Sequence, residues 1–230
     1  MKTVLVLAFL GLAHAVPWVP EPRGEQWWLD LHRSFVENTA RNADNITVLF
    51  YGDSITQGWF GPGKEVYDRK YAPLGTANYG ISGDRTEHLL FRIQNDEVKG
   101  LNPKLIVLKI GTNNIGNDPR DNADDTVRGI HAVADLLLQV LPNSKLLLLG
   151  VLPRNDASWF QLVADINIKI SKFHDGNRVH FLDMWHEFST AFGVVDPQLY
   201  SGDQLHLEAP GYQKWADTMD RLFNELLNSN

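Results

Sequence analysis

The chain has 230 residues, of which 43% are hydrophobic and 21% charged, and its formal net charge at pH 7 is −7. This composition is typical of a single globular domain and excludes a largely disordered chain, while the acidic balance argues against a surface for nucleic acid or anionic membranes. Because the chain contains no cysteine, disulfides and thiolate metal sites are excluded as well.

The first fifteen residues have the pattern of a secretory signal peptide. Lys2 gives a positive start, residues 4–13 are almost entirely apolar, and Ala13-His14-Ala15 has the small-x-small pattern of a cleavage site. The apolar run is far shorter than the ~20 residues needed to span a bilayer. We therefore predict a signal peptide over 1–15 with cleavage after Ala15, and a secreted, extracellular protein with no integral membrane segment.

The next thirty residues predict an extension and a helix ahead of the main domain. Residues 16–24 are rich in proline and tryptophan and predict an irregular surface segment, whereas the apolar spacing over 25–41 predicts an amphipathic helix. We expect Trp18, Trp27 and Trp28 to form a hydrophobic clamp that packs this helix. The region ends at residue 44, just before the sequon Asn45-Ile46-Thr47, where Asn45 is a predicted N-glycosylation site.

From residue 45 to residue 230, short apolar runs alternate with helical patterns. Strands are predicted over 47–51, 77–79, 105–110, 146–152 and 179–182, and helices over 85–95, 123–141, 158–174 and 213–227. The third and fourth runs are continuously apolar, which is typical of strands buried on both faces. The alternation predicts one three-layer α/β domain, a mostly parallel five-stranded sheet with helices on both faces.

A candidate nucleophile follows the first predicted strand. Gly52-Asp53-Ser54 lies at the carboxyl edge of the sheet, where open α/β folds place their chemistry. A serine hydroxyl needs a base, and the stretch Asp203-Gln204-Leu205-His206 offers an aspartate to orient a histidine that takes the serine proton. The pair Asp183 and His186 has the same spacing and follows the last strand, so spacing alone leaves both pairs open.

Two further loops follow the second and third predicted strands and reach the same edge. Gly83 offers an unhindered backbone N–H, and Asn113 a side-chain amide. With the N–H of Ser54 they would make three donors for a developing oxyanion. We expect Asp53 to bind loop amides, and Arg85 and Arg154 to form ordinary surface salt bridges.

Four blocks carry a resemblance to a known superfamily. Gly52-Asp53-Ser54, Gly83, Gly111-Thr112-Asn113 and Asp203-x-x-His206 resemble the blocks of the SGNH (GDSL-type) hydrolases, and the stretches N-Y-G-I-S-G-D-R-T and V-L-K-I-G-T-N-N are most similar to catalytic subunits of type Ib platelet-activating factor acetylhydrolase. The resemblance implies a flavodoxin-like fold and an SGNH hydrolase domain over 45–230. It also implies catalysis without a cofactor or metal, through an acyl-serine.

Carried over residue by residue, the resemblance assigns the site. It makes Ser54 the nucleophile, with Asp203 and His206, rather than Asp183 and His186, completing the triad. It assigns the oxyanion hole to Ser54, Gly83 and Asn113. The enzymes it resembles are cytosolic, so the predicted signal peptide is a departure from them.

We therefore predict a secreted serine esterase that removes short acyl groups, acetyl above all, from a small acyl-ester substrate. The acyl pocket is predicted at Ile55, Thr112 and Leu205, because these branched residues adjoin the catalytic groups in sequence. The open alternatives are a glycan O-acetyl esterase, a lysophospholipase, or a secreted binding or matrix protein that kept the fold without activity. The sequence leaves a homodimer open.

Overall fold

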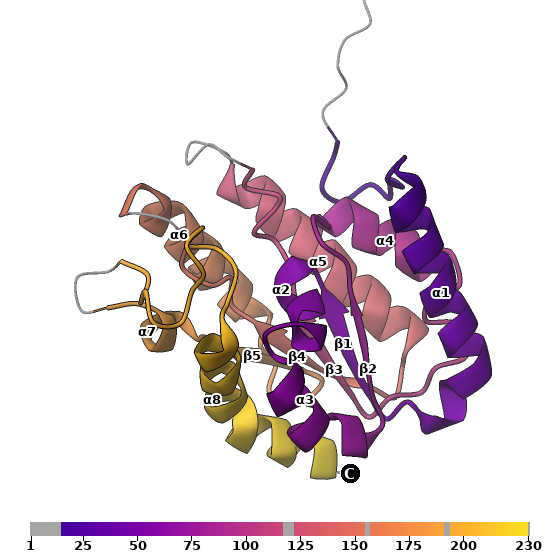
Figure 1. Cartoon of the computed structure of the whole chain (residues 1–230). Helices are drawn as coiled ribbons and strands as arrows, with labels where there is room; N and C mark the ends of the chain where they lie inside the picture. Colours follow the sequence, from indigo (N-terminus) through magenta and orange to yellow (C-terminus); the bar gives the residue numbers. More distant parts are fainter. Residues whose placement is uncertain (1–14, 117–121, 155–156, 191–193, 230) are drawn as a thin grey trace, which may run out of the picture.

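The computed structural model describes residues 15–116, 122–154, 157–190 and 194–229, so the predicted signal peptide lies outside it except for Ala15. Five parallel strands form one sheet in the order β2-β1-β3-β4-β5 (Figure 1). The strands are β1 (Val48–Gly52), β2 (Thr76–Gly80), β3 (Leu105–Lys109), β4 (Lys145–Leu149) and β5 (Val179–Leu182). The predicted five-stranded parallel sheet is confirmed, with β4 ending three residues earlier than expected.

Helices cover both faces of the sheet (Figure 1). On one face lie α1 (Gln26–Asn42), α4 (Thr86–Gln94), α5 (Ala123–Val140) and α6 (Phe160–Ile170), and on the other α2 (Ser54–Gln57), α3 (Lys64–Lys70), α7 (Trp185–Phe188) and α8 (Ala209–Asn228). The five predicted helices are present, whereas the short α2, α3 and α7 were not predicted. In the described ranges no helix combines the length and apolarity needed to cross a membrane.

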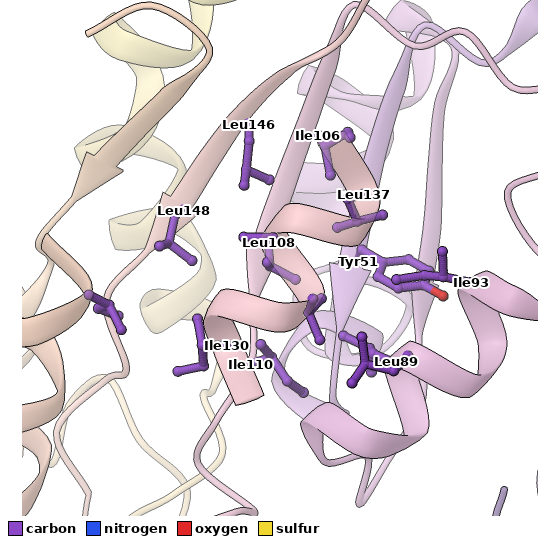
Figure 2. Packing of buried hydrophobic residues seen from close by; sticks show 14 of the residues in the cluster. Tyr51, Leu89, Ile93, Ile106, Leu108, Ile110, Ile130, Leu137, Leu146 and Leu148 are labelled. Atoms are coloured by element: carbon purple, nitrogen blue, oxygen red, sulfur yellow. The ribbon is translucent and has the colours of Figure 1, made fainter. Parts of the chain in front are cut away.

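The strand side chains alternate between two cores. In β1, Leu49 and Tyr51 face the α4–α5 layer, while Val48 and Phe50 face the α3–α8 layer. All of them are buried, which explains why the strand is apolar without a break. Figure 2 shows part of the first core, where strand residues pack against α4 and α5; they are Ile106, Leu108, Leu146 and Leu148, with Leu89, Ile93, Ile130 and Leu137 from the helices.

The register of the central strands brings their carboxyl ends to one level. Gly52 of β1 is paired with Gly80 of β2 and with Lys109 of β3. Gly52 permits this close approach, because a Cβ there would lie 2.2 Å from the Lys109 carbonyl oxygen. The loops that carry Ser54, Gly83 and Asn113 therefore leave the sheet side by side.

The N-terminal helix is held by buried polar contacts rather than by a tryptophan clamp. Trp28 is fully buried, and its Nε1 donates to Asp84 Oδ1 at 2.6 Å. Trp27 is 48% exposed, and the ring of Trp18 lies against the guanidinium of Arg128. The prediction of one clamp is therefore correct only for Trp28, because the other two rings pack on arginine side chains instead.

Candidate active site

Ser54 is the first residue of α2, immediately after β1. The preceding Asp53 caps this short helix, since its Oδ1 accepts from the Ile55 N–H at 2.9 Å. The predicted role of Asp53 in binding a loop amide is thereby confirmed. Its other oxygen lies 3.5 Å from Nζ of Lys109, and both side chains are buried. Burial lowers the pKa of Lys109, against the opposing influence of Asp53.

A hydrogen-bonded chain joins Ser54 to the loop before α8. Nε2 of His206 lies 2.8 Å from Oγ of Ser54, and Nδ1 of the same ring lies 2.6 Å from Oδ2 of Asp203. The other two members of the chain are about half exposed, with 42% of the His206 side chain and 48% of the Asp203 side chain accessible. The site is therefore open to solvent at its acid–base end.

The Asp203 carboxylate is held in its ionised form. Burial would raise its pKa, but hydrogen bonds from His206, from the Ser201 hydroxyl and from the backbone N–H groups of His206 and Leu205 outweigh that effect and hold the pKa of Asp203 well below its usual range. An ionised carboxylate can only accept, so Nδ1 of His206 is the protonated ring nitrogen. This leaves Nε2 with a lone pair directed at the Ser54 hydroxyl.

The alternative pair of identical spacing lies elsewhere. Asp183 follows β5, and its Oδ1 accepts from the Trp185 N–H, at the start of α7, at 2.9 Å. In the described parts of the chain no hydrogen bond joins Asp183 to His186, and both line a separate pocket together with Phe181 and Trp185. The histidine that reaches Ser54 is His206.

The predicted oxyanion donors sit on the loops after β2 and β3. Gly83 has φ +78°, which favours glycine, and it is solvent exposed. Within the described residues, neither its N–H nor that of Ser54 has an acceptor. The Asn113 amide donates one hydrogen to the Asp84 carbonyl at 2.8 Å, which leaves its second hydrogen unused by that bond.

The neighbouring Asn114 has a structural role. Its side chain is buried, accepts from the Thr86 N–H at 3.0 Å, and donates to the Thr86 hydroxyl and to Glu87. Asn114 therefore ties the β3 loop to the start of α4. Its amide is fully engaged, so Asn113 is the one of the two that can serve a ligand.

The residues predicted to line the acyl pocket differ in exposure. Ile55 and Thr112 are each 1% exposed, whereas Leu205 is partly buried and packs against the α3–α8 core. Their contact with a bound acyl group stays a prediction.

Arg154 is buried, contrary to the prediction from the sequence. Its side chain is buried and donates to the Thr112 carbonyl at 2.8 Å, with its guanidinium over the Trp159 ring. The predicted surface position is wrong, because the β4 loop folds back over the β3 loop and buries the Arg154 side chain. One signal in the sequence was the position of Leu152-Pro153-Arg154 just after a buried strand. Arg85 does pair with Glu87, at 2.9 Å.

The sequence profile of the GDSL-like lipase/acylhydrolase family matches residues 50–214, a segment that spans the nucleophile loop, the Asn113 loop and the Asp203–His206 loop. The chain belongs to this family. It is therefore a carboxylic ester hydrolase. The alpha2 subunit of human platelet-activating factor acetylhydrolase IB is 33% identical over 218 residues, covering 93% of this chain and 91% of the relative. The human alpha1 subunit is 30% identical over 213 residues, covering 91% and 88%.

Solved structures of GDSL-type hydrolases share the fold. A GDSL-like lipase from Bacteroides thetaiotaomicron superposes with a TM-score of 0.67 at 23% identity, covering 84% of this chain and 98% of that one. An acetylxylan esterase from Geobacillus stearothermophilus superposes with a TM-score of 0.60 at 18% identity, covering 80% and 94%. At this level of identity the likeness concerns the fold, and it confirms the predicted three-layer GDSL-type architecture.

Proposed function

We propose that this GDSL-family hydrolase is a secreted serine esterase that removes short acyl groups, acetyl above all, through an acyl-serine intermediate. The observation that carries the proposal is the unbroken hydrogen-bonded chain from Asp203 through His206 to Ser54, at 2.6 and 2.8 Å. It supplies a nucleophile, a base with a free lone pair and an ionised group that orients the base.

Acylation begins when Nε2 of His206 takes the Ser54 proton as Oγ attacks the ester carbonyl. The imidazolium that forms is stabilised by the Asp203 carboxylate, whose pKa is held low by four hydrogen bonds. His206 then gives its proton to the departing alcohol, and the acyl group remains on Ser54. Water repeats the sequence on the acyl-enzyme, with His206 acting as base and then as acid.

The negative charge on the carbonyl oxygen needs donors that are in place beforehand. We assign this role to the N–H groups of Ser54 and Gly83 and to the second amide hydrogen of Asn113. The absence of protein acceptors for the two backbone groups among the described residues supports this assignment. Removing one such donor typically costs about 10²–10³ in kcat, so the three together would carry much of the rate.

The esterase proposal is tested by labelling the purified protein with a fluorophosphonate probe and by assaying p-nitrophenyl acetate. Stoichiometric labelling of wild type, with no labelling and no turnover in Ser54→Ala, is expected. Ser54 is partly buried and belongs to neither hydrophobic core, so the variant should melt like wild type. Folded wild type that neither reacts nor turns over would favour the alternative of a binding or matrix protein.

Secretion is part of the proposal and rests on the N-terminal pattern of Lys2, the apolar run over 4–13 and Ala13-His14-Ala15. Expression of the full chain in a secreting cell line should release a protein that begins at Val16. Asn45 is exposed, which supports its use as a glycan acceptor, and Asn45→Gln should then lower the apparent mass. A cell-retained protein that still begins at Met1 would contradict this part.

A further inference from the structure

We infer that Arg23 is a positioning residue for the proposed oxyanion hole, because its guanidinium fixes the peptide group whose N–H is the Gly83 donor. The inference rests on the proposed esterase function and adds to it. It concerns residues 16–25, here called the N-terminal strap, for which the sequence predicted no more than an irregular segment and the start of a helix.

The strap lies along the start of α4 and is anchored at several points. The Pro17 carbonyl accepts from the Thr86 hydroxyl at 2.7 Å, and the Glu21 N–H donates to the Glu87 carbonyl at 3.1 Å. Trp18 contacts Arg128 of α5. In Figure 1 the strap is the indigo segment that leads into α1 beside α4. Because α4 follows the Gly83 loop directly, these contacts bring Arg23 to that loop.

Arg23 is itself held in a single arrangement. Its Nη1 donates to the Ser82 carbonyl at 2.7 Å, and its Nη2 donates to Glu25 at 2.7 Å. The guanidinium also lies over the Trp27 ring, 4.9 Å from the centroid, and only 16% of the side chain is exposed. A carboxylate and an aromatic face therefore hold the guanidinium ready to bind the carbonyl.

The Ser82 carbonyl and the Gly83 N–H belong to the same peptide group. In a planar trans peptide these two bonds point in opposite directions. With the carbonyl oxygen fixed towards Arg23, the N–H of Gly83 must face away from the strap. A charged donor on the carbonyl also polarises the peptide group, which strengthens its N–H as a donor.

This peptide group needs such an anchor because it lies next to a glycine. Gly83 has φ +78° and carries no Cβ, so rotation of the Ser82–Gly83 peptide meets little steric resistance. A rotated peptide would present a carbonyl oxygen where the oxyanion needs a donor. Arg23 packs closely enough to oppose this, since a Cβ on Gly83 would lie 2.7 Å from its Nη1.

The other anchors of the loop do not replace Arg23. Gln57 accepts from the Ser82 N–H at 3.0 Å, and Asn113 donates to the Asp84 carbonyl at 2.8 Å. Each fixes a different peptide group. Within the described part of the chain, Arg23 is the one donor to the Ser82 carbonyl.

The test compares Arg23→Ala, Arg23→Gln and Arg23→Lys with wild type in hydrolysis of p-nitrophenyl acetate. We expect Arg23→Ala to lower kcat at least about tenfold, part of the loss seen when an oxyanion donor is removed, with KM changed less than about twofold. Arg23→Lys should recover part of the rate because it keeps a charged donor. Affinity for a trifluoromethyl ketone, which forms a tetrahedral adduct on serine, should fall by the same factor as kcat/KM.

Two matched controls separate positioning from packing. Arg128→Ala loosens the strap at Trp18 without touching the Ser82 peptide, and Arg33→Ala removes an exposed arginine of α1. Both should keep wild-type kcat. A similar kcat loss in Arg128→Ala, or an unchanged kcat in Arg23→Ala, would overturn the inference.

If Arg23→Ala does not fold, Arg23→Gln takes its place: it keeps a long side chain but no charge, so its kcat should lie below that of Arg23→Lys, and wild-type kcat in Arg23→Gln would overturn the inference. The wild-type assay distinguishes a failure of the proposed esterase function from a failure of the proposed role of Arg23. Wild type that is neither active nor labelled refutes the esterase proposal itself. Active wild type whose kcat is unchanged by the Arg23 substitutions refutes only the role of Arg23.

Discussion

Lys109 and Asp53 form a buried ion pair one residue ahead of Ser54, with Nζ 3.5 Å from Oδ2 and neither side chain more than 1% exposed. The pair links the end of β3 to the end of β1, where Gly52 and Lys109 share a register. The other oxygen of Asp53 caps α2, so one carboxylate both pairs with Lys109 and caps the helix. The nucleophile loop is therefore tied to the neighbouring strand by electrostatics as well as by the sheet.

Removing one charge of this pair should destabilise the protein more than removing both charges. Lys109→Met leaves a buried carboxylate without its cation, and we expect a loss of about 3–5 kcal/mol in the free energy of unfolding. The double variant Asp53→Asn with Lys109→Met removes both charges and should regain most of that loss. Urea unfolding at pH 7.5 measures both values, and a double variant no more stable than Lys109→Met would contradict the argument.

The two aspartate–histidine pairs can be separated by activity. His206→Ala removes the base that contacts Ser54 and should reduce kcat for p-nitrophenyl acetate by at least about 10³-fold. His186→Ala is the matched control, because the same substitution is made in the pair of identical spacing that lines a different pocket. The opposite result, an inactive His186→Ala and an active His206→Ala, would make His186 of α7 the base.

Asn113 and Asn114 provide a second matched pair. Asn113→Ala should lower kcat by about 10²–10³-fold with a much smaller change in KM, because it removes one oxyanion donor. Asn114→Ala should instead lower the melting temperature, since its buried amide holds the start of α4. Equal kcat effects in both variants, with equal losses of stability, would mean that Asn113 only shapes its loop.

Acidification should weaken the fold through His88. Burial, together with the charges of Arg23 and Arg85, lowers the pKa of His88 to about 4. In the unfolded chain histidine binds its proton near pH 6.5. Between about pH 6.5 and 4 the unfolded state therefore binds a proton at this residue that the native state does not bind, which favours unfolding. The contribution of neutral His88 is therefore complete above pH 6.5 and is lost as the pH falls towards 4, by up to about 3 kcal/mol.

His88→Gln should reduce this pH dependence. Nδ1 of His88 accepts from the Arg85 N–H at 3.0 Å, a capping bond that glutamine can also make without titrating. Urea unfolding at pH 7.5, 6 and 4.5 should show a flatter stability profile than wild type. The exposed His131, replaced by Gln, is the control and should leave the profile unchanged. An identical profile in His88→Gln would exclude His88 as a contributor.

Acyl-chain preference tests the predicted pocket. Ile55 and Thr112 are buried and β-branched, so the wall they form should not adjust, while partly buried Leu205 is the side chain that can be trimmed. Forcing an extra methylene against such a wall costs ~1–3 kcal/mol, more than the ~0.8 kcal/mol gained by burying it. We expect kcat/KM to fall at least about tenfold from acetyl to butyryl esters, and Leu205→Ala to soften the fall. A preference for octanoyl esters would support the lysophospholipase alternative.

The apolar pattern alone predicts the layered architecture, because continuous apolar runs such as 105–108 and 146–149 are buried on both faces between two helical layers. It also placed Ser54, Gly83 and Asn113 at one edge, since the carboxyl ends of parallel strands meet there. Local spacing leaves His206 and His186 equivalent, and in the sequence it is the resemblance to SGNH hydrolases that favours His206. The tertiary structure separates them directly, because β5 lies at the far side of β4, whereas the loop before α8 folds back to Ser54. The positions of Arg154 and Arg23 likewise depend on loops distant in sequence, since Arg154 contacts Thr112 and Arg23 contacts Ser82. Local sequence patterns do not predict such contacts.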